Sequence, residues 1–499
     1  MARLLALDEG TTSCRAIVFD LDGQRLGVAQ QEFEQIFPQP GWVEHDATEI
    51  YEKQSRMAQQ VLAETGVNPE ELAGIGITNQ RETVVVWDRR TGQPIGNAIV
   101  WQDRRTAELM DRWRGGGNDE MVHEKTGLLL DPYFCASKLS WLLDNVEGAR
   151  SAADAGHLAF GTIDCWLLWN LTSGAVHATD ESNASRTLLY NIRSREWDQD
   201  LLRLFNIPEA VLPEVVPCSG ELGSTTILGG NVAVRGMIGD QQSALFGQAC
   251  VKPGMAKSTF GTGCFLLLNT GDQPMVSNNN LLATIAWSTS SGECTYALEG
   301  SVFMGGATIQ WLRDGLGIIK SAAEVNELAA SVPDSGGVVL VPAFAGLGAP
   351  YWDAWARGSI SGLTRGSTSA HIARAALEGI ACTVTDVLNA MEQDAGIPLK
   401  ELRVDGGAAA SDLLMQIQTD LLNVEVLRPT MLETTAFGAV GMAAMAAGVL
   451  PGPDDMADHW TLDRRFKSKI DDTHRRDLLR QWKRGVERAR GWAEEDETE

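Results

Sequence analysis

The sequence predicts an α/β protein with two or three domains. Its 499 residues exceed what one ordinary hydrophobic core organises. Short β-like runs at 72–77, 84–87 and 338–341 alternate with stretches of helical periodicity, which is typical of α/β folds. Lys252-Pro253-Gly254 interrupts this pattern, so we expect a boundary within 250–254 that separates residues 1–249 from 250–499.

The first candidate site element is the segment 8–13, which joins the apolar runs 4–7 and 16–19 and therefore predicts the tip of a β-hairpin. Gly10 frees the backbone for close approach to a ligand, and three successive hydroxyls offer donors to anionic oxygens. Asp8, at the end of the first strand, is a candidate ligand for Mg²⁺ or its water. The segment suits a nucleotide's phosphates, although Gly, Thr and Ser are also ordinary turn residues.

Two further tips of this kind strengthen the prediction of a phosphate site. The segment 258–263 stands directly before the apolar run 265–268, and 405–408 follows the run 402–404. Open α/β sheets bind ligands at strand ends. We therefore expect one composite site, with the first two tips facing each other across a cleft between two half-molecules.

Two helices are expected in the second half of the chain. Between 369 and 394 apolar residues recur at every fourth position, with hydroxyl residues before the segment and Gly396 and Pro398 after it. The run 436–450 is rich in Gly and Ala and falls short of the roughly 20 residues that span a bilayer. We expect a tightly packed core helix there and no membrane insertion.

Composition bounds the partners and the compartment. A net charge of −25 without a basic stripe argues against nucleic acid as a partner. The eight cysteines form no Cys-x-x-Cys pair, and the seven histidines show no metal-ligand spacing beside them, so buried or incidental thiols are expected. A strand motif begins close to the first residue and leaves no room for a secretory signal, which favours the cytoplasm.

The acid excess has a second interpretation. Acidic surfaces also stay dispersed in a high-salt cytoplasm, an alternative that a salt titration of activity would test. The acidic segment 494–497 is expected to be a solvated tail.

Two long motifs resemble the signatures of the FGGY family of carbohydrate kinases. The segment 133–145 is similar to the first signature, and 358–363 with 371–372 and 375–378 is similar to the second. The resemblance extends from Leu4 to about Trp492, and within the family the chain looks like the members that phosphorylate glycerol. It implies a two-domain actin-like ATPase fold, also called ribonuclease H-like, with the active-site cleft between the domains.

The resemblance also implies an activity and its partners. The activity is ATP-dependent phosphorylation of glycerol to sn-glycerol 3-phosphate with Mg²⁺, the first step of glycerol catabolism. The implied small-molecule partners are glycerol and ATP or ADP. Relatives are commonly dimers or tetramers, so a homo-oligomer is expected.

An acceptor pocket follows from the residues that match the family's polyol site. Arg81 and Glu82 follow an apolar strand, and an Arg fork donates while a carboxylate accepts, which suits hydroxyls that do both. Without the motif around it, this dipeptide would be interpreted as a surface ion pair. The other matching residues are Trp101, Tyr133 and Phe265, which would cover the carbon chain, and Gln241.

Asp240 is the candidate catalytic residue. An aspartate at a strand end in a closing cleft can accept the proton of the attacking hydroxyl. The alternative is a helix N-cap, a position that Asp favours, and the two roles are compatible. The resemblance implies that Mg²⁺ bridges phosphates near Asp8 and Asp240.

The remaining matches concern the nucleotide. Those on the first and second tips are Thr11, Thr12, Ser13, Arg15 and Thr262, and those beside the nucleoside are Gly306, Gln310, Gly407 and Ser411. At Ser411 the family usually has Asn, so the donor and acceptor face of an amide is lost there. Ser411 could instead cap a helix at 412–422. We therefore expect weaker discrimination of ATP from other nucleoside triphosphates.

Three alternative functions fit the sequence less well. Kinases of xylulose or ribulose would share the phosphate tips but need room for a longer acceptor. An actin-like structural ATPase would use the fold without an acceptor, and Asp240-Gln241 beside a polyol pocket argues against it. A dehydrogenase is disfavoured because 74–79 ends in Asn79 and matches no Gly-x-Gly-x-x-Gly motif, and a P-loop is also missing.

Overall fold

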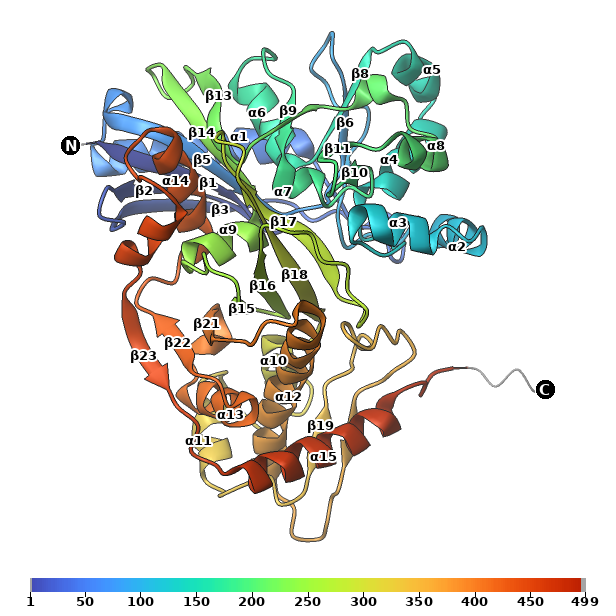
Figure 1. Ribbon diagram of the computed structural model, residues 1–499, viewed down its shortest axis with the longest axis vertical. Coiled ribbons are helices and arrows are strands. Elements are labelled where there is room, and N and C mark those ends of the chain that lie inside the picture. Colours follow the sequence, from blue (N-terminus) through green and yellow to red (C-terminus); the bar gives the residue numbers. More distant parts are fainter. Residues whose placement is uncertain (1, 495–499) are drawn as a thin grey trace.

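The computed structural model describes residues 2–494 and has two halves, one above the other in Figure 1, each built around a large β-sheet. The first sheet has six strands in the order β13-β14-β5-β1-β2-β3. In chain order they are β1 Arg3–Glu9, β2 Ser13–Asp20, β3 Arg25–Glu32, β5 Leu72–Asn79, β13 Ser219–Thr225 and β14 Val232–Gly239. β1, β5 and β14 run parallel, and β2, β3 and β13 extend the sheet as antiparallel strands.

The second sheet repeats this plan with one additional strand. Its order is β17-β18-β16-β15-β21-β22-β23, and β15, β21 and β22 are parallel as β1, β5 and β14 are. The strands are β15 Met255–Phe260, β16 Cys264–Gly271, β17 Leu282–Ser288, β18 Cys294–Val302, β21 Glu401–Asp405, β22 Val426–Pro429 and β23 Leu462–Phe466. This duplicated arrangement agrees with the two-domain fold that the sequence predicts.

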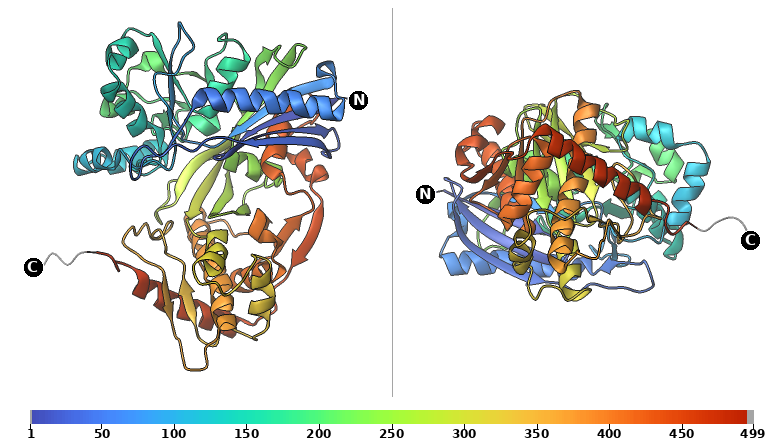
Figure 2. Two further views of the ribbon diagram at one scale, coloured as in Figure 1. Left: turned by 180° about the vertical axis from the view of Figure 1, so that it is seen from behind. Right: turned by 90° about the horizontal axis from the view of Figure 1, so that it is seen from below.

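Both halves contain helices, and some of those in the first half form a separate cluster beside the sheet. In the first half they are α1 Ala47–Thr65, α2 Ala107–Gly115, α3 Asp119–Thr126, α4 Cys135–Asn145, α5 Ala149–Asp154, α6 Ile163–Leu171, α7 Glu181–Ala184, α8 Gln199–Phe205 and α9 Asp240–Gly247. In the second half they are α10 Gly306–Asp314, α11 Glu324–Ala330, α12 Ser369–Ala395, α13 Asp412–Leu422, α14 Thr434–Ala446 and α15 Asp472–Ala489. Figure 2 shows α1 lying along one face of the first sheet.

Five short strand pairs complete the described strands. They are β4 Glu44–His45 with β7 Ala98–Ile99, β6 Val85–Asp88 with β8 Leu158–Gly161, β9 Ala178–Asp180 with β12 Glu214–Val216, β10 Tyr190–Asn191 with β11 Glu196–Trp197, and β19 Val339–Val341 with β20 Ser359–Ser361. The runs that the sequence predicts at 72–77, 84–87 and 338–341 correspond to β5, β6 and β19.

The long helix of the second half is confirmed as α12. Its N-terminus is closed by a capping box in which Thr368 and His371 exchange hydrogen bonds, and Gly396 ends it with a φ of 60°. A left-handed residue at this position is the usual end of a helix, and glycine adopts it without strain. The apolar positions of the four-residue pattern face the core of the second half.

The predicted core helix of the second half, α14, packs on the sheet of the first half. It lies beside β1 and β5 in Figure 1. Side chains of α14 and of the first sheet join the same buried cluster. A Cβ at Gly76 or at Gly236 would collide with the backbone carbonyl of Ala439, so glycine is what lets the helix approach this closely. The two sheets lie on either side of residue 250, and the division into 1–249 and 250–499 stays a prediction because α14 packs across it.

Side chains of the first strand show how the sheet is covered on both faces. Leu5 and Leu7 pack with α1 and α6, whereas Leu4 and Ala6 pack with α14. Strand residues point alternately to opposite faces, so a strand buried on both sides is apolar throughout. Asp8 and Glu9, the last two residues of β1, are buried although they are acidic, and exposure rises only at Gly10 and Thr11 in the turn.

Within residues 2–494 no helix is long and apolar enough to cross a membrane. All eight cysteines are free thiols and seven of them are buried, as expected from their scattered positions. The predicted acidic tail, 494–497, lies outside the described residues except for its first position.

Candidate active site

The first tip is a β-hairpin turn, as predicted. β1 and β2 pair up to Glu9 and Cys14, and the N–H of Gly10 donates to the carbonyl of Ser13 at 3.0 Å. The hydroxyl of Thr11 accepts a hydrogen bond of 3.1 Å from the indole N–H of Trp101. The tip of the predicted phosphate site therefore touches a wall of the predicted acceptor pocket.

Arg15 is held by two carboxylates beside this tip. Its guanidinium pairs with Asp8 and, at 2.7 Å, with Glu433, which stands directly before α14. Burial raises the pKa of Asp8, and the neighbouring Arg15 opposes that rise. Glu433 was not predicted, because nothing near it in the sequence separates it from an ordinary surface carboxylate.

The second and third tips lie side by side in the second half. β15 and β16 form the predicted hairpin, and β21, which leads into the third tip, runs parallel to β15 with Asp405 opposite Thr259. The N–H of Gly306 donates to the carbonyl of Gly261 at 2.8 Å, which anchors the start of α10 on the second tip. A Cβ on Gly306 would collide with that carbonyl, so the close approach requires glycine.

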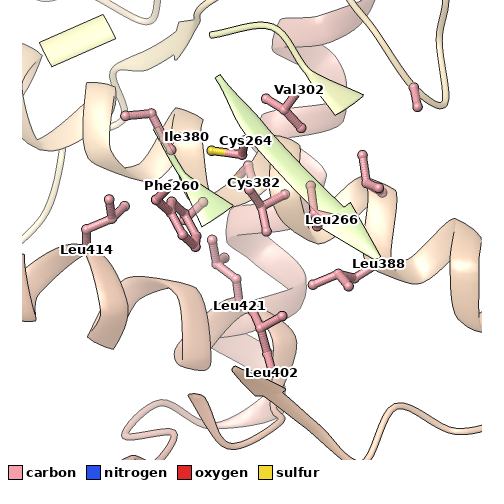
Figure 3. Close-up of a cluster of buried hydrophobic side chains, with 14 of the residues drawn as sticks. Phe260, Cys264, Leu266, Val302, Ile380, Cys382, Leu388, Leu402, Leu414 and Leu421 are labelled. Atoms are coloured by element: carbon pink, nitrogen blue, oxygen red, sulfur yellow. The ribbon is translucent and has the colours of Figure 1, made fainter. Parts of the chain in front are cut away.

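These elements enclose a cavity of about 600 Å³. Five of the predicted nucleotide residues line it, namely Thr262, Gly306, Gln310, Gly407 and Ser411. The volume is typical of a site for a nucleoside-sized ligand. The wall behind the second tip is a buried apolar cluster, shown in Figure 3, in which Phe260 and Cys264 pack with Ile380 and Leu414.

Glycine stands at the two positions of the third tip, 406 and 407, for different physical reasons. Gly406 has a φ of 85° and a Cβ there would collide with the backbone of Phe260, so the fold itself requires glycine. At Gly407 a Cβ would meet no described atom within 4 Å, and the residue faces the cavity. Space for a ligand is therefore the remaining reason for glycine at 407.

Ser411 caps α13, which confirms the alternative role that the sequence suggests for it. Its hydroxyl oxygen accepts from the N–H of Leu414 at 3.0 Å and its hydroxyl donates to the side-chain oxygen of Asn326. Asn326, on α11, lines the same cavity. An amide is thus present beside Ser411, supplied by a distant segment that sequence reasoning missed.

Asp240 is the first residue of α9, and Gly239 is the N-cap. The prediction of an N-cap role is therefore wrong by one position, because the strand continues to Gly239. The Asp240 carboxylate accepts from the N–H of Gln241 at 2.7 Å and lies 3.2 Å from Nε of Arg81. Its side chain remains 29% exposed, which leaves it open to a ligand.

Asp8 and Asp240 lie at one edge of the first sheet. In the parallel strands Asp8 is opposite Thr78 of β5, and Gly239 is opposite Asn79, the next residue of β5. Asp8 lies near the end of β1 and Asp240 directly follows β14, and these two strands are two spacings apart, about 10 Å. Each adds its negative charge to the field at the other, as the effect of Asp240 on the pKa of Asp8 indicates.

Arg81 and Glu82 belong to a buried ion-pair network. Arg81 pairs with Glu299 at 3.0 Å, and Arg186 bridges Glu82 at 2.6 Å and Glu299 at 2.9 Å. Burial by itself raises the pKa of Glu299, but the guanidiniums of Arg186 and Arg81 lower it to about 2. The alternative of a surface ion pair is therefore wrong, since Arg81 and Glu82 are both buried.

Arg186 and Glu299 were not predicted. Glu299 is the one charged residue in strand β18. A lone carboxylate within an otherwise uncharged strand is the sequence feature that could have identified it. Arg186 had no such signal. Both hold the Arg81-Glu82 pair in place.

Aromatic side chains flank this network. The rings of Trp101 and Tyr133 meet edge to face with centroids 5.5 Å apart, and the guanidinium of Arg186 lies 6.0 Å from the Tyr133 ring. Phe265 is paired with Thr259 across β15 and β16 in the other half. The three aromatic residues predicted to cover an acceptor thus come from both halves.

A duplicated α/β fold with a nucleoside-sized cavity in one half, and an accessible aspartate beside buried ion pairs and aromatic side chains, is typical of two-domain sugar and polyol kinases. The model of the FGGY family of carbohydrate kinases matches the chain at residues 3–247 for the N-terminal domain and 256–447 for the C-terminal domain. The chain belongs to the FGGY family of carbohydrate kinases.

Its relatives within the family include proteins named glycerol kinase. One from Aromatoleum aromaticum is 59% identical over 494 residues, which cover 99% of each chain, and one from Deinococcus radiodurans is 57% identical over 496 residues with the same coverage. The crystal structure of Plasmodium falciparum glycerol kinase with ADP superposes with a TM-score of 0.93 at 35% identity and 98% coverage of both chains. Gluconate kinase from Lactobacillus acidophilus shares the fold, with a TM-score of 0.88, 20% identity and 97% coverage of both chains.

Proposed function

We propose that this protein transfers the γ-phosphoryl group of ATP to glycerol and releases ADP and sn-glycerol 3-phosphate. The observation that carries the proposal is the position of Asp240, which stands accessible at the sheet edge next to Arg81 and Gln241. The relatives named glycerol kinase, at 55–59% identity over nearly the full chain, support the same acceptor.

Glycerol is the acceptor that the pocket residues suit. The ion pairs of Glu82 within residues 2–494 run through Oε1, which leaves Oε2 to accept from a hydroxyl. Arg81 offers donors beside it, and Gln241 offers an amide. Trp101, Tyr133 and Phe265 would cover the short carbon chain, and burial of the polar groups favours a small ligand that pairs all of them.

Asp240 would act as the general base. Its carboxylate accepts the proton of the attacking glycerol hydroxyl while the new O–P bond forms and the bond between the γ-phosphorus and the β-phosphate oxygen breaks. ADP leaves with the charge of the broken bond. Buried Arg81 holds one oxygen of the carboxylate at 3.2 Å, and such fixed positioning is most of what phosphoryl transfer asks of a protein.

The nucleotide would lie between the tips. Thr11, Thr12, Ser13 and Arg15 would contact phosphates from the first half and Thr262 from the second, while the 600 Å³ cavity would hold the nucleoside against Gly306, Gln310, Gly407 and Ser411. The hydroxyls and N–H groups of opposed hairpin tips are suited to anionic oxygens. Closure of the halves would exclude the water that hydrolyses ATP.

Asp8 and Asp240 are the residues that would hold Mg²⁺. Within the described chain no group of three His, Cys, Asp or Glu side chains forms a complete metal site. Mg²⁺ is usually bound by one or two carboxylates together with substrate phosphates, so these two aspartates at one sheet edge fit it. When bound, Mg²⁺ would neutralise charge on the phosphates.

We also propose a cytoplasmic, homo-oligomeric enzyme. ATP use fits the cytoplasm, and eight free thiols fit its reducing conditions. Dimers or tetramers are the expected forms, which light scattering would distinguish.

The test of the proposed function is an acceptor panel. Release of ADP is measured with glycerol, erythritol, xylulose and ribulose at equal concentrations of ATP and Mg²⁺. We expect glycerol to give a kcat/KM at least tenfold above each of the others. A preference for xylulose or ribulose would reject glycerol as the acceptor, and hydrolysis independent of any acceptor, with filaments, would support a structural ATPase.

A further inference from the structure

Lys257 is a buried cation at the contact between the two halves, and no sequence motif draws attention to it. It lies on β15 with no exposed surface. Its ammonium donates to the side-chain oxygen of Gln241 at 2.6 Å and to the hydroxyl of Thr259 at 3.1 Å. Among residues 2–494 the Lys257 ammonium forms no ion pair, because no carboxylate oxygen lies within 4.0 Å of it.

A lysine in this position is costly for the fold. Taking an ammonium out of water without a carboxylate partner is unfavourable, and an apolar side chain of the same length would avoid that cost. Burial lowers the pKa of Lys257 to about 8, although the negative charges of Asp405, Asp240 and Glu299 oppose the shift. A costly group of this kind at a candidate active site points to a function.

Its partners indicate which function. An ammonium has only donors, so it accepts nothing and fixes the amide of Gln241 with the oxygen toward Lys257. The NH₂ group of Gln241 then faces Asp240, and it lies 3.2 Å from Oδ2 of that carboxylate. If the amide turned over, its oxygen would face the carboxylate instead, and two acceptors would meet.

We propose that Lys257 is a positioning residue that fixes the orientation of the Gln241 amide and through it the Asp240 carboxylate. Lys257 comes from the second half and Gln241 from the first. The Lys257–Gln241–Asp240 relay is therefore built across the contact between the two halves. The inference rests on the roles proposed above for Asp240 and Gln241.

The test is a double-mutant cycle on Lys257 and Gln241. Lys257→Met, Gln241→Leu and the double variant are compared with the wild type for kcat and for the KM values of acceptor and ATP. Hydrogen bonds to charged groups are worth enough that Lys257→Met should lower kcat about 10- to 100-fold. The KM of ATP should stay within about threefold, because Lys257 does not line the nucleoside cavity.

The coupling between the two substitutions in kcat distinguishes a positioning role of Lys257 from a general structural role. In the Gln241→Leu background, Lys257→Met should change kcat less than about threefold, since the amide that Lys257 orients is gone. Lys257→Arg, which keeps donors and charge, should recover part of the loss. Equal factors in both backgrounds, or a kcat of Lys257→Met within threefold of wild type, would overturn the proposal.

A second buried lysine provides the control. Lys138 is also fully buried, but its ammonium donates to the carbonyls of Pro132, Tyr133 and Phe134. Lys138→Met should therefore act additively with Gln241→Leu. Should Lys257→Met not fold, as thermal unfolding would report, Lys257→Gln is the second neutral variant. The cycle uses whichever acceptor the wild type turns over fastest, so a wrong acceptor would correct the proposed function without affecting this test.

Discussion

Replacing Asp240 with Asn tests the proposed base most selectively. The amide keeps the size of the carboxylate and one oxygen for the N–H of Gln241, but it cannot accept the proton of the attacking hydroxyl. Loss of a general base costs 10²- to 10⁴-fold in rate, and we expect a fall of about 10³ in kcat, or about 4 kcal/mol in activation free energy.

The contacts of Asp240 place the expected loss above the lower end of that range. Its two oxygens face three donors, Nε of Arg81 at 3.2 Å, the N–H of Gln241 at 2.7 Å and the NH₂ of Gln241 at 3.2 Å. Either orientation of an Asn amide brings a donor against a donor, and Lys257 prevents the Gln241 amide from turning to relieve it. A misaligned pocket therefore adds to the loss of the base.

The assay is glycerol-dependent ADP release together with nucleotide binding by calorimetry. Binding of ATP and ADP is measured without Mg²⁺, because Asp240 is also a proposed Mg²⁺ ligand, and it should stay within about twofold, since Asp240 does not line the nucleoside cavity. Asp111→Asn, an exposed substitution in the same half, serves as the control and should leave kcat unchanged. Turnover of Asp240→Asn within tenfold of wild type would remove Asp240 from the role of base.

Three further predictions concern the nucleoside cavity and a buried histidine. Gly407→Ala should leave the melting temperature within about 2 °C but raise the KM of ATP roughly tenfold, since its Cβ meets only ligand space. A nucleotide panel should show weaker preference for ATP than relatives with Asn at 411 have, and Asn326→Ala should weaken it further; an unchanged, strict ATP preference would contradict both. His45 is fully buried, and burial lowers its pKa to about 4. The folded state then binds fewer protons than the unfolded state, so about 3 kcal/mol of stability present above pH 6.5 is lost as the pH falls toward 4. Urea unfolding at pH 7 and pH 4.5 should show a smaller loss in His45→Gln than in wild type, and equal losses would refute the assignment.

Local sequence patterns were sufficient wherever the signal lies within a few consecutive residues. The hairpin tips at 8–13 and 258–263 combine glycine with hydroxyls between apolar runs, and α12 carries both of its caps in the sequence. The cap of α13 could be predicted because serine at position 411 directly precedes the helix, and serine is a common N-cap residue. In each case the structure needs no distant partner to specify the element.

The missed residues depend on partners far away in the chain. Arg186 and Glu299 are 113 residues apart, and each charge is stabilised in the interior by its partner. Lys257 and Gln241 meet across the two halves, and Asn326 reaches Ser411 from 85 residues away. Charged or amide side chains usually lie on the surface, so only tertiary structure reveals that these are buried and joined.

The packing of α14 is a related case. Its Gly and Ala content predicted a tightly packed helix, but composition does not say on which sheet. The answer lies in Gly76 and Gly236, which are glycines because a helix from the other half of the chain passes over them.

The most direct measurement of the central claim is a stoichiometry of products. The protein is incubated with ATP, Mg²⁺ and glycerol, and ADP and sn-glycerol 3-phosphate are quantified with an enantioselective enzyme assay. We predict one sn-glycerol 3-phosphate for each ADP, and almost no ADP when glycerol is left out. Free phosphate released in place of a phosphorylated alcohol, at a rate that glycerol does not change, would contradict the claim that two halves hold ATP while Asp240 activates glycerol.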